Sequence, residues 1–284
     1  MVAPAAHSPC VDDVVAAHAA LRRRRPLVQC LSNAVSVNFM ANVLLAAGAA
    51  PAMVDNPQEA ASFAGVADAV LVNLGTPTLA QVEAMRLVTS SAQDAGRPWV
   101  LDPVGAGGLP WRGAIAAELL DHRPAIVRGN ASEIIGLAGL GGGARGVDSS
   151  AESSQAVNAA VLLLDYATAV SASGPVDHVV GRIVCHERAR VGLIRVSGGS
   201  PFLPRVTATG CALGALAAAY ASVASDPLAG LVAAHVHFAV AAELAEQKAD
   251  GPGSFAVAFL DAIDHVDERA LRERARIEPV CWME

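Results

Sequence analysis

Residues 27–54 of the chain read LVQCLSNAVSVNFMANVLLAAGAAPAMV, and the pattern in this stretch decides the fold. A short apolar run at Leu27–Cys30 precedes a helical pattern over 35–47, which ends at Gly48. A second apolar run follows at Ala50–Val54. Glycine suits the left-handed residue with which many helices end. Two buried strands on either side of such a helix form a βαβ unit, whose strands are parallel and covered by helices.

The same alternation continues along most of the chain. Further strand-like runs lie at Ala69–Leu74, Trp99–Val104, Ala125–Arg128 and 168–172, and helical patterns lie at 57–64, 79–95, 112–121, 131–138 and 153–165. The segment 176–197 predicts antiparallel strands at one edge, and the last third predicts helices over 210–224, 228–247 and 253–272. A glycine-rich loop at 139–150 interrupts the alternation without changing it. We therefore expect one α/β domain over residues 1–284, with a mostly parallel central sheet, helices on both faces and residues 1–25 as an N-terminal helical extension.

The composition excludes several classes of protein. Of the 284 residues 53% are hydrophobic, which excludes a disordered chain, and the formal net charge of −7 argues against a nucleic-acid partner. Only one of the 20 basic residues is a lysine, Lys248, and Ala249 and Asp250 follow it. The P-loop needs Gly-Lys-Ser/Thr, so the chain cannot carry one. If it handles a nucleotide, it uses another design.

Cysteine usage and hydropathy bear on the compartment. The five cysteines are odd in number and form no C-x-x-C pair, which favours reduced thiols in a cytoplasm. The N-terminus shows no signal peptide. The stretch 228–245 is long enough to cross a membrane, but it is mostly alanine and contains His235, His237 and Glu243. We therefore expect a buried helix there and a cytoplasmic protein with no membrane partner.

The residues at the ends of the predicted strands are mostly polar or flanked by glycine. Ligands of parallel α/β sheets bind beyond the carboxyl ends of the strands, so these residues are the first candidates for a site. They are Asn33, Met53, Asn73–Thr76, Asp102–Gly107, Arg128–Glu133 and Ser173–Gly174. Each alone is as well explained by a cap or a turn, whereas their occurrence at one sheet edge favours a binding site.

The sequence VTATGCALG at 206–214 opens the predicted helix 210–224. Its glycine-flanked loop presents unpaired N–H groups at a helix N-terminus, which is an anion site. Cys211 lies in the first turn, where the helix lowers a thiol pKa, so we expect a partly ionised sulfur. The alternative is a small buried cysteine between helix and sheet. The eight histidines offer no metal-ligand spacing, since His235 and His237 point to different faces, and we expect surface or core roles for them.

These segments resemble the hydroxyethylthiazole kinase family of the ribokinase-like superfamily. The matching motifs are the stretch 26–53, NLGT (73–76), VLDPVGAG (100–107), IVRGNASEI (126–134), GVDS (146–149), SASG (171–174), VTATGCALGA (206–215) and GPGSF (251–255). The resemblance runs from about Pro26 to about Leu260. It implies a ribokinase-like three-layer sandwich. It also implies Mg²⁺-dependent transfer of the ATP γ-phosphate to the hydroxyl of 4-methyl-5-(2-hydroxyethyl)thiazole in thiamine biosynthesis and salvage, by a homotrimer with sites between subunits.

On the acceptor side, the resemblance places Cys211 beside the substrate hydroxyl, as a weak general base or a positioning group. Met53 would contact the thiazole, with Asn33 and Thr76 lining the pocket. Ala208 borders the substrate at a position where many members of the family have glycine. The extra methyl group should therefore affect binding of the acceptor.

On the nucleotide side, the resemblance implies that Arg128 contacts the phosphates of ATP and that Ser173 also binds ATP. The backbone amides from Thr209 and Gly210 to the cysteine that follows would hold the transferring phosphoryl group. Asp102 and Glu133 would organise Mg²⁺, directly or through waters. A sparse pair of carboxylates suits Mg²⁺, which keeps several of its waters.

Three other functions stay open on the residues alone. One is a different ribokinase-like enzyme, such as a hydroxymethylpyrimidine kinase or a nucleotide-repair dehydratase, although these carry aspartate at the position of Cys211. The second is a thiol hydrolase or acyltransferase with Cys211 as nucleophile, which would want a histidine base. The third is a non-catalytic ligand-binding protein on the same fold.

Overall fold

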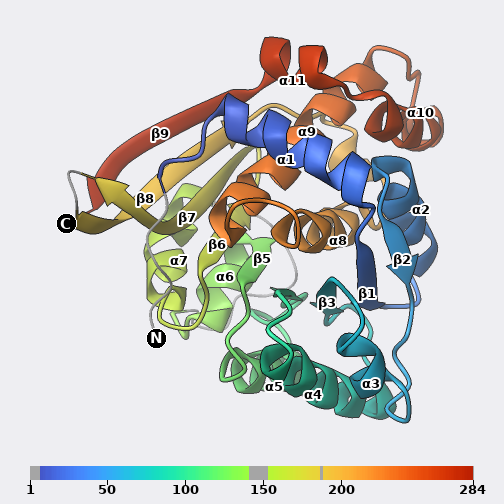
Figure 1. Cartoon of the computed structure of the whole chain (residues 1–284), viewed down its shortest axis with the longest axis vertical. Helices are drawn as coiled ribbons and strands as arrows, with labels where there is room; N and C mark the ends of the chain where they lie inside the picture. The colour runs from blue at the N-terminus through green and yellow to red at the C-terminus, as the bar shows by residue number, and fades with distance from the viewer. Residues whose placement is uncertain (1–6, 141–152, 186–187, 284) are drawn as a thin grey trace.

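The computed structural model describes residues 7–140, 153–185 and 188–283, and these form one nine-stranded sheet (Figure 1). The strand order is β2-β1-β3-β4-β5-β6-β7-β8-β9. The strands are β1 (Leu27–Leu31), β2 (Ala50–Ala52), β3 (Ala69–Asn73), β4 (Trp99–Asp102), β5 (Ile126–Asn130), β6 (Ala169–Ser173), β7 (Val176–Cys185), β8 (Arg188–Ser197) and β9 (Arg276–Met283). From β2 to β6 neighbouring strands are parallel, and from β6 to β9 they are antiparallel.

The strands of the parallel part are apolar on both sides because both faces of the sheet are covered. In β3, Ala69 and Leu71 pack into one core, whereas Val70 and Val72 pack into the other. All four are fully buried. Alternate side chains of a strand point to opposite faces, so a continuous apolar run is what two covered faces require.

Helices cover both faces (Figure 1). One face carries α1 (Val11–Arg24), α2 (Val37–Ala47), α8 (Thr209–Ala221), α9 (Pro227–Glu246), α10 (Pro252–His265) and α11 (Glu268–Arg274). The other carries α3 (Ala60–Ala64), α4 (Leu79–Asp94), α5 (Pro110–Leu120), α6 (Ala131–Leu137) and α7 (Val157–Leu163). Two short 3₁₀ turns span Ser153–Ala156 and Leu203–Arg205. The predicted three-layer α/β sandwich with a mostly parallel sheet is thereby confirmed.

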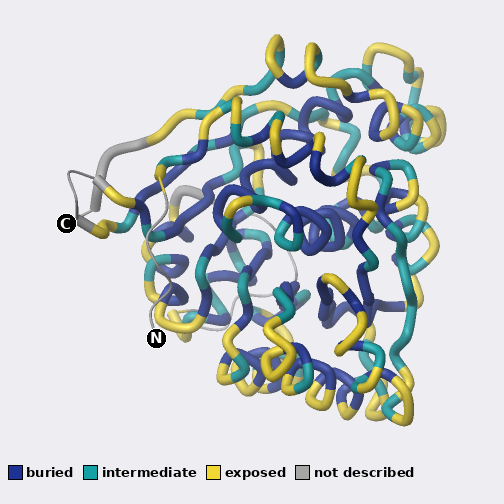
Figure 2. The backbone as a smooth tube through the Cα atoms, in the orientation of Figure 1, coloured by how far each residue is buried: buried dark blue, intermediate teal, exposed yellow. Residues whose placement is uncertain are grey.

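Helices α8 and α9 lie at the centre of the first helical layer and are buried along almost their whole length (Figure 2). Their small side chains let α8 pack closely on β1, β3, β4 and β5. Helix α9 is apolar and long enough to cross a membrane, but 83% of its most apolar window is buried inside the protein. The buried helix expected over 228–247 is therefore present, since a helix that is apolar all round belongs in a core.

The N-terminal segment contains the expected helix, α1, which packs against α9 and α11. Val14 and Leu21 on its inner face are fully buried. The His18 ring lies edge-on to that of His237 in α9, with ring centroids 5.0 Å apart. This helix is therefore part of the main core.

The C-terminal region differs from the prediction in two ways. The helix expected over 253–272 is two helices, because Asp267 accepts a hydrogen bond from the backbone N–H of Ala270 at 2.8 Å and begins α11. Strand β9 was not predicted, since its sequence mixes charged residues and a proline with apolar ones. The helix expected over 153–165 is shorter, at Val157–Leu163. Most of the glycine-rich loop 139–150, with the GVDS motif, lies outside the described residues.

Candidate active site

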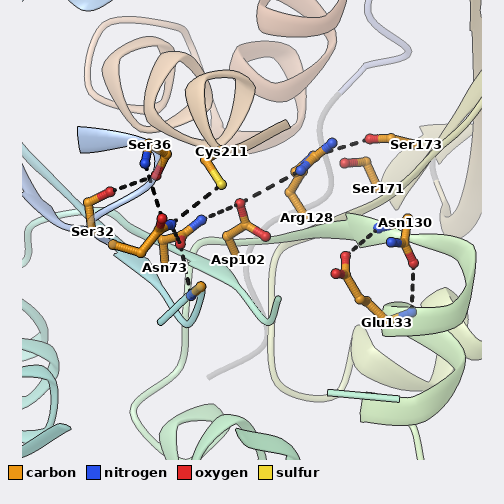
Figure 3. A network of polar contacts seen from close by, with 12 residues as sticks. Ser32, Ser36, Asn73, Asp102, Arg128, Asn130, Glu133, Ser171, Ser173 and Cys211 are labelled. Carbon is orange, nitrogen blue, oxygen red and sulfur yellow. Dashed lines mark hydrogen bonds and ion pairs between the residues drawn. The ribbon is translucent and has the colours of Figure 1, made fainter. Parts of the chain in front are cut away.

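Five polar side chains form a continuous row across neighbouring strands near their carboxyl ends, and Figure 3 labels four of them, Asn73, Asp102, Arg128 and Ser173. These four belong to β3, β4, β5 and β6 in that order, and the fifth, Asn33, follows the end of β1. The structure thus brings together residues from distant parts of the chain, since Asn33 and Ser173 lie 140 positions apart. Parallel strands place their carboxyl ends at one edge, which is why the row exists.

Hydrogen bonds and one ion pair connect the row from end to end. Asn33 Nδ2 donates to Asn73 Oδ1 at 2.7 Å, and Asn73 Nδ2 donates to Asp102 Oδ2 at 2.8 Å. Arg128 Nη1 lies 3.7 Å from Asp102 Oδ2. Arg128 Nε donates to Ser173 Oγ at 3.2 Å. The guanidinium is therefore held on both sides, and within the described part of the chain its other N–H groups have no hydrogen-bond partner.

Asp102 is the buried charge of the row, with 1% of its surface exposed. Its Oδ1 is buried and has no hydrogen-bond partner among the residues that the structure describes. Burial, and to a smaller extent the nearby Glu133, raise the pKa of Asp102 to about 7, although Arg128 and Asn73 oppose this shift. A buried carboxylate with an unpaired oxygen is suited to a cation, because a cation offsets the cost of burying the charge.

The carboxylate of Glu133 accepts hydrogen bonds from backbone N–H groups rather than from the side chains of the row. Its Oε1 accepts from the N–H of Gly105 at 3.0 Å and its Oε2 from the N–H of Asn130 at 2.8 Å. Figure 3 shows Glu133 beside Asn130, in the first turn of α6. Each carboxylate oxygen has a second lone pair, so Glu133 can still accept from a metal-bound water.

Helix α8 covers the row with its glycines. A Cβ atom built on Gly210 would lie 3.3 Å from Arg128 Nη1, and one on Gly214 would lie 3.2 Å from Asp102 Oδ2. The Thr209 hydroxyl donates to the carbonyls of Leu203 and Val206, so it holds the loop before the helix. The N-terminus of α8 therefore lies directly against the arginine, as an anion site requires.

The thiol of Cys211 corrects the prediction of a partly ionised sulfur. Burial above all, and then the charge of Asp102, raise the pKa of Cys211, although hydrogen bonds and Arg128 partly oppose this. Loss of solvent outweighs the helix N-terminus here, so the sulfur is a neutral thiol near pH 7. Asn33 Nδ2 donates to its Sγ at 3.7 Å, which connects the thiol to the row.

Two cavities flank the row. The glycine-lined cavity, of about 600 Å³, lies at the end that carries Arg128 and Ser173, and its wall includes Gly174, Gly198, Gly199, Thr209, Gly210 and His235. The Met53 cavity, of about 460 Å³, lies at the Asn33 end, and its wall includes Met53, Thr76, Asp55 and Gln81. Each residue predicted to bind ATP lines the first, and Asn33, Met53 and Thr76 line the second. Ala208 lines neither cavity.

Ala208 is the N-cap residue of α8 and has φ +73°. Left-handed φ favours glycine, so alanine is strained at this position. The departure from glycine noted in the sequence therefore falls where the backbone itself prefers glycine.

Sequence reasoning missed two residues of this region. Asn73 is fully buried and joins Asn33 to Asp102, and it was seen only as one polar residue after a strand. His235 was expected to be a satisfied core residue, and it is buried, but it also lines the glycine-lined cavity. Its partners lie about 60 residues earlier in the chain, so no local motif marks it.

The described residues contain no group of three or more His, Cys, Asp or Glu side chains placed to hold a metal ion. A metal at this site would therefore have few protein ligands. This is the usual state of Mg²⁺, which one or two carboxylates and a phosphorylated substrate hold between them.

A three-layer α/β sandwich with an arginine–carboxylate pair between two small-molecule cavities, beneath a helix N-terminus, defines a small-molecule phosphotransferase. The model of the hydroxyethylthiazole kinase family matches residues 18–269, and the chain belongs to this family.

Known proteins agree with this assignment. A hydroxyethylthiazole kinase from Rhodococcus erythropolis is 60% identical over 268 residues, which are 94% of each chain. A solved hydroxyethylthiazole kinase structure from Pyrococcus horikoshii is 34% identical, with a TM-score of 0.84, and the match covers 95% of this chain and 99% of that one. A pyridoxal kinase from Staphylococcus aureus, solved with AMP-PCP and pyridoxal, has a TM-score of 0.59 over 89% of this chain and 97% of that one. At 13% identity it shows the fold alone.

Proposed function

We propose that the protein transfers the γ-phosphoryl group of ATP to the hydroxyl of 4-methyl-5-(2-hydroxyethyl)thiazole, giving the thiazole phosphate and ADP in thiamine biosynthesis and salvage. The observation that carries this proposal is the row from Asn33 to Ser173, which joins two cavities of small-molecule size. Family membership supports the choice of acceptor.

ATP occupies the glycine-lined cavity in this proposal. Arg128 faces its phosphates, held in place by Asp102 and Ser173. The main-chain N–H groups of Thr209 and Gly210 lie at the start of α8, where the helix has no internal partners for them. A fixed guanidinium and fixed N–H groups stabilise the charge of the transferring phosphoryl group without having to reorganise.

The acceptor occupies the Met53 cavity. Met53 supplies an apolar, adaptable contact for a heteroaromatic ring, and Asn33 and Thr76 supply polar atoms beside it. Cys211 lies at the Asn33 end of the row and orients the reacting hydroxyl. Ala208, at the cap of α8, influences the acceptor through the shape of the loop rather than by lining the cavity.

Asp102 and Glu133 fit a magnesium ion. The unpaired Oδ1 of Asp102 offers one ligand position, and Glu133 offers lone pairs to a bound water. Mg²⁺ bound there would neutralise negative charge on the phosphate oxygens. Its recruitment would also relieve the raised pKa of Asp102 by stabilising the ionised carboxylate.

Phosphoryl transfer asks little of a general base, because the transition state is loose and the hydroxyl proton leaves late. A neutral thiol at Cys211 agrees with this requirement. The chain's main contributions are therefore alignment of the two substrates and stabilisation of charge.

The rest of the assignment concerns the whole chain. We propose that residues 1–284 act as a single kinase domain, that the protein forms a homotrimer with sites between subunits, and that it works in the cytoplasm. Packing of α1 against the main core supports the first point. Sedimentation of the purified protein tests the trimer directly.

The decisive experiment incubates the protein with ATP, Mg²⁺ and a panel of small heteroaromatic alcohols that includes hydroxyethylthiazole and hydroxymethylpyrimidine. We expect phosphorylated thiazole by mass spectrometry, dependence on Mg²⁺ and little product from the pyrimidine. Preferential phosphorylation of the pyrimidine would reassign the enzyme within the superfamily. No phosphorylated product from any alcohol, with ligand binding retained, would instead indicate a binding protein.

A further inference from the structure

Two buried histidines lie two positions apart on α9 and face in different directions. His237 faces the helical layer, where its Nδ1 lies 2.8 Å from Tyr220 Oη and its Nε2 lies 3.0 Å from the carbonyl oxygen of Ile263. His235 faces the sheet and the glycine-lined cavity. The two residues share burial and helix but not surroundings.

His235 bonds to two different parts of the β6–β7 hairpin. Its Nδ1 lies 2.8 Å from Asp177 Oδ2, and its Nε2 lies 3.0 Å from Ser171 Oγ. A carboxylate only accepts, so Nδ1–H is the donor, and a neutral ring then accepts the Ser171 hydroxyl at Nε2. With a fully buried side chain, His235 is held in one orientation by both bonds.

These two bonds enclose the residue that holds Arg128. Ser171 lies two positions before Ser173 on β6, and Asp177 lies four positions after it. Asp177 Oδ1 also accepts from the N–H of Gly174 at 3.0 Å, so it closes the turn that begins at Ser173. His235 therefore fixes the strand before Ser173 and the turn after it.

We propose that His235 is a positioning residue of the nucleotide site, which acts through Ser171 and Asp177 to fix the 173–177 turn and thereby Arg128. The inference rests on the proposed function, because it assigns nucleotide phosphates to Arg128. Without His235, the turn would be free to move, and Ser173 Oγ would no longer be held where it accepts the hydrogen bond from Arg128 Nε. The guanidinium would then sample several orientations, and ATP would bind less tightly.

The test compares His235→Ala with His235→Asn, and uses His237→Ala as the matched control on the same helix. Asparagine places an amide near the position of Nδ1 and restores the bond to Asp177, whereas alanine restores nothing. We measure ATP binding by titration calorimetry without the alcohol, then KM for each substrate, kcat and Tm. Wild-type turnover is measured first, so that absence of kinase activity counts against the proposed function alone.

We expect His235→Ala to weaken ATP binding about tenfold, because it removes a hydrogen bond to the charged Asp177. His235→Asn should recover much of this loss, because the asparagine amide can replace that bond. KM for the alcohol should stay within about twofold of the wild type, because the Met53 cavity is untouched. His237→Ala also removes a buried histidine from α9, so it should lower Tm about as much as His235→Ala does, but it should leave ATP binding unchanged. An active wild type whose His235 variants lose Tm but keep full affinity for ATP would overturn the inference.

Ser171→Ala protects the test against misfolding of the histidine variants. Ser171 is fully buried and is not among the residues that line the cavity, so loss of its hydroxyl removes one of the two bonds of His235 without removing a cavity side chain. We expect a measurable loss of ATP affinity, smaller than that of His235→Ala. Wild-type affinity in Ser171→Ala and in whichever His235 variant folds would overturn the inference.

Discussion

The glycine-lined cavity and the Met53 cavity lie on either side of one row of side chains, yet they are built differently. Four of the residues that line the first are glycines, Gly174, Gly198, Gly199 and Gly210, and Gly198 and Gly199 have φ of +126° and +98°. Among the described residues that line the second, such as Met53 and Thr76, there is no glycine. The difference matches the two ligands that we propose for them.

The phosphate groups of ATP always have the same shape and charge. Main-chain N–H groups at the start of a helix can therefore recognise them, because the fold itself fixes their positions. An organic acceptor has an individual shape, and side chains recognise it through apolar contact and a few polar atoms. Substitutions should therefore affect one ligand or the other according to the cavity they touch.

The largest effect should come from Arg128→Ala, on the nucleotide side. Loss of the guanidinium removes a preorganised donor, so we expect kcat/KM to fall by the equivalent of roughly 2 to 4 kcal/mol. The fold should stay intact, because the side chain lines the cavity and its removal leaves the backbone pairing of β5 with β6 in place. Arg86→Ala, which removes an exposed arginine paired with Glu118, is the control. A variant with wild-type kcat/KM and Tm would contradict the assignment of Arg128.

A smaller effect should come from Cys211, which lines neither cavity but accepts a hydrogen bond from Asn33 in the wall of the Met53 cavity. Because burial raises the pKa of this thiol, we expect Cys211→Ala to lose less than the roughly 10²–10⁴-fold that a full general base contributes. Cys211→Asp should retain substantial activity, since a carboxylate can also orient a hydroxyl. Initial rates of both variants, with Cys10→Ala as the exposed-thiol control, check this.

A covalent role of Cys211 would give other results. A trapped phosphocysteine, or complete loss of activity in Cys211→Asp with the fold preserved, would show that the sulfur acts as a nucleophile. The phosphoryl group would then pass through a covalent bond to Cys211 Sγ.

The smallest effect should come from Ala208→Gly. Glycine relieves the left-handed φ, so we expect a gain in stability of about 1 kcal/mol or less, because glycine's larger unfolded-state entropy opposes it. KM for the thiazole alcohol should fall, while KM for ATP stays nearly unchanged. Ala219→Gly, in the last turn of α8, is the matched control and should instead lose roughly 1 kcal/mol. If only KM for ATP moves, residue 208 belongs to the nucleotide side.

The sequence predicts the local parts of this architecture well. Apolar runs such as Ala69–Leu74 and helix ends such as Gly48 are encoded in a few neighbouring residues, so the order of strands and helices follows from the pattern. Strand ends share one sheet edge in any parallel α/β fold, which is why Asp102 and Arg128 could be grouped before the structure was known.

Features that depend on distant contacts could not be predicted. His235 obtains its role from Asp177 and Ser171, and the Cys211 pKa depends on how tightly α8 packs over Asp102. Strand β9 owes its place to pairing with β8, since its own sequence lacks a regular alternation. In each case tertiary contact outweighs the local pattern.

The close approach of Gly210 and Gly214 to Arg128 and Asp102 has a consequence for how such an enzyme diversifies. A Cβ atom at either position would lie only 3.3 Å from Arg128 Nη1 or 3.2 Å from Asp102 Oδ2, so each substitution would require the charged pair or the helix to shift, and the phosphate-handling half leaves little room for variation. No glycine is among the described residues that line the Met53 cavity, so its wall can be altered one side chain at a time. Descendants of this sequence could therefore acquire new alcohols as acceptors while keeping the same phosphoryl donor.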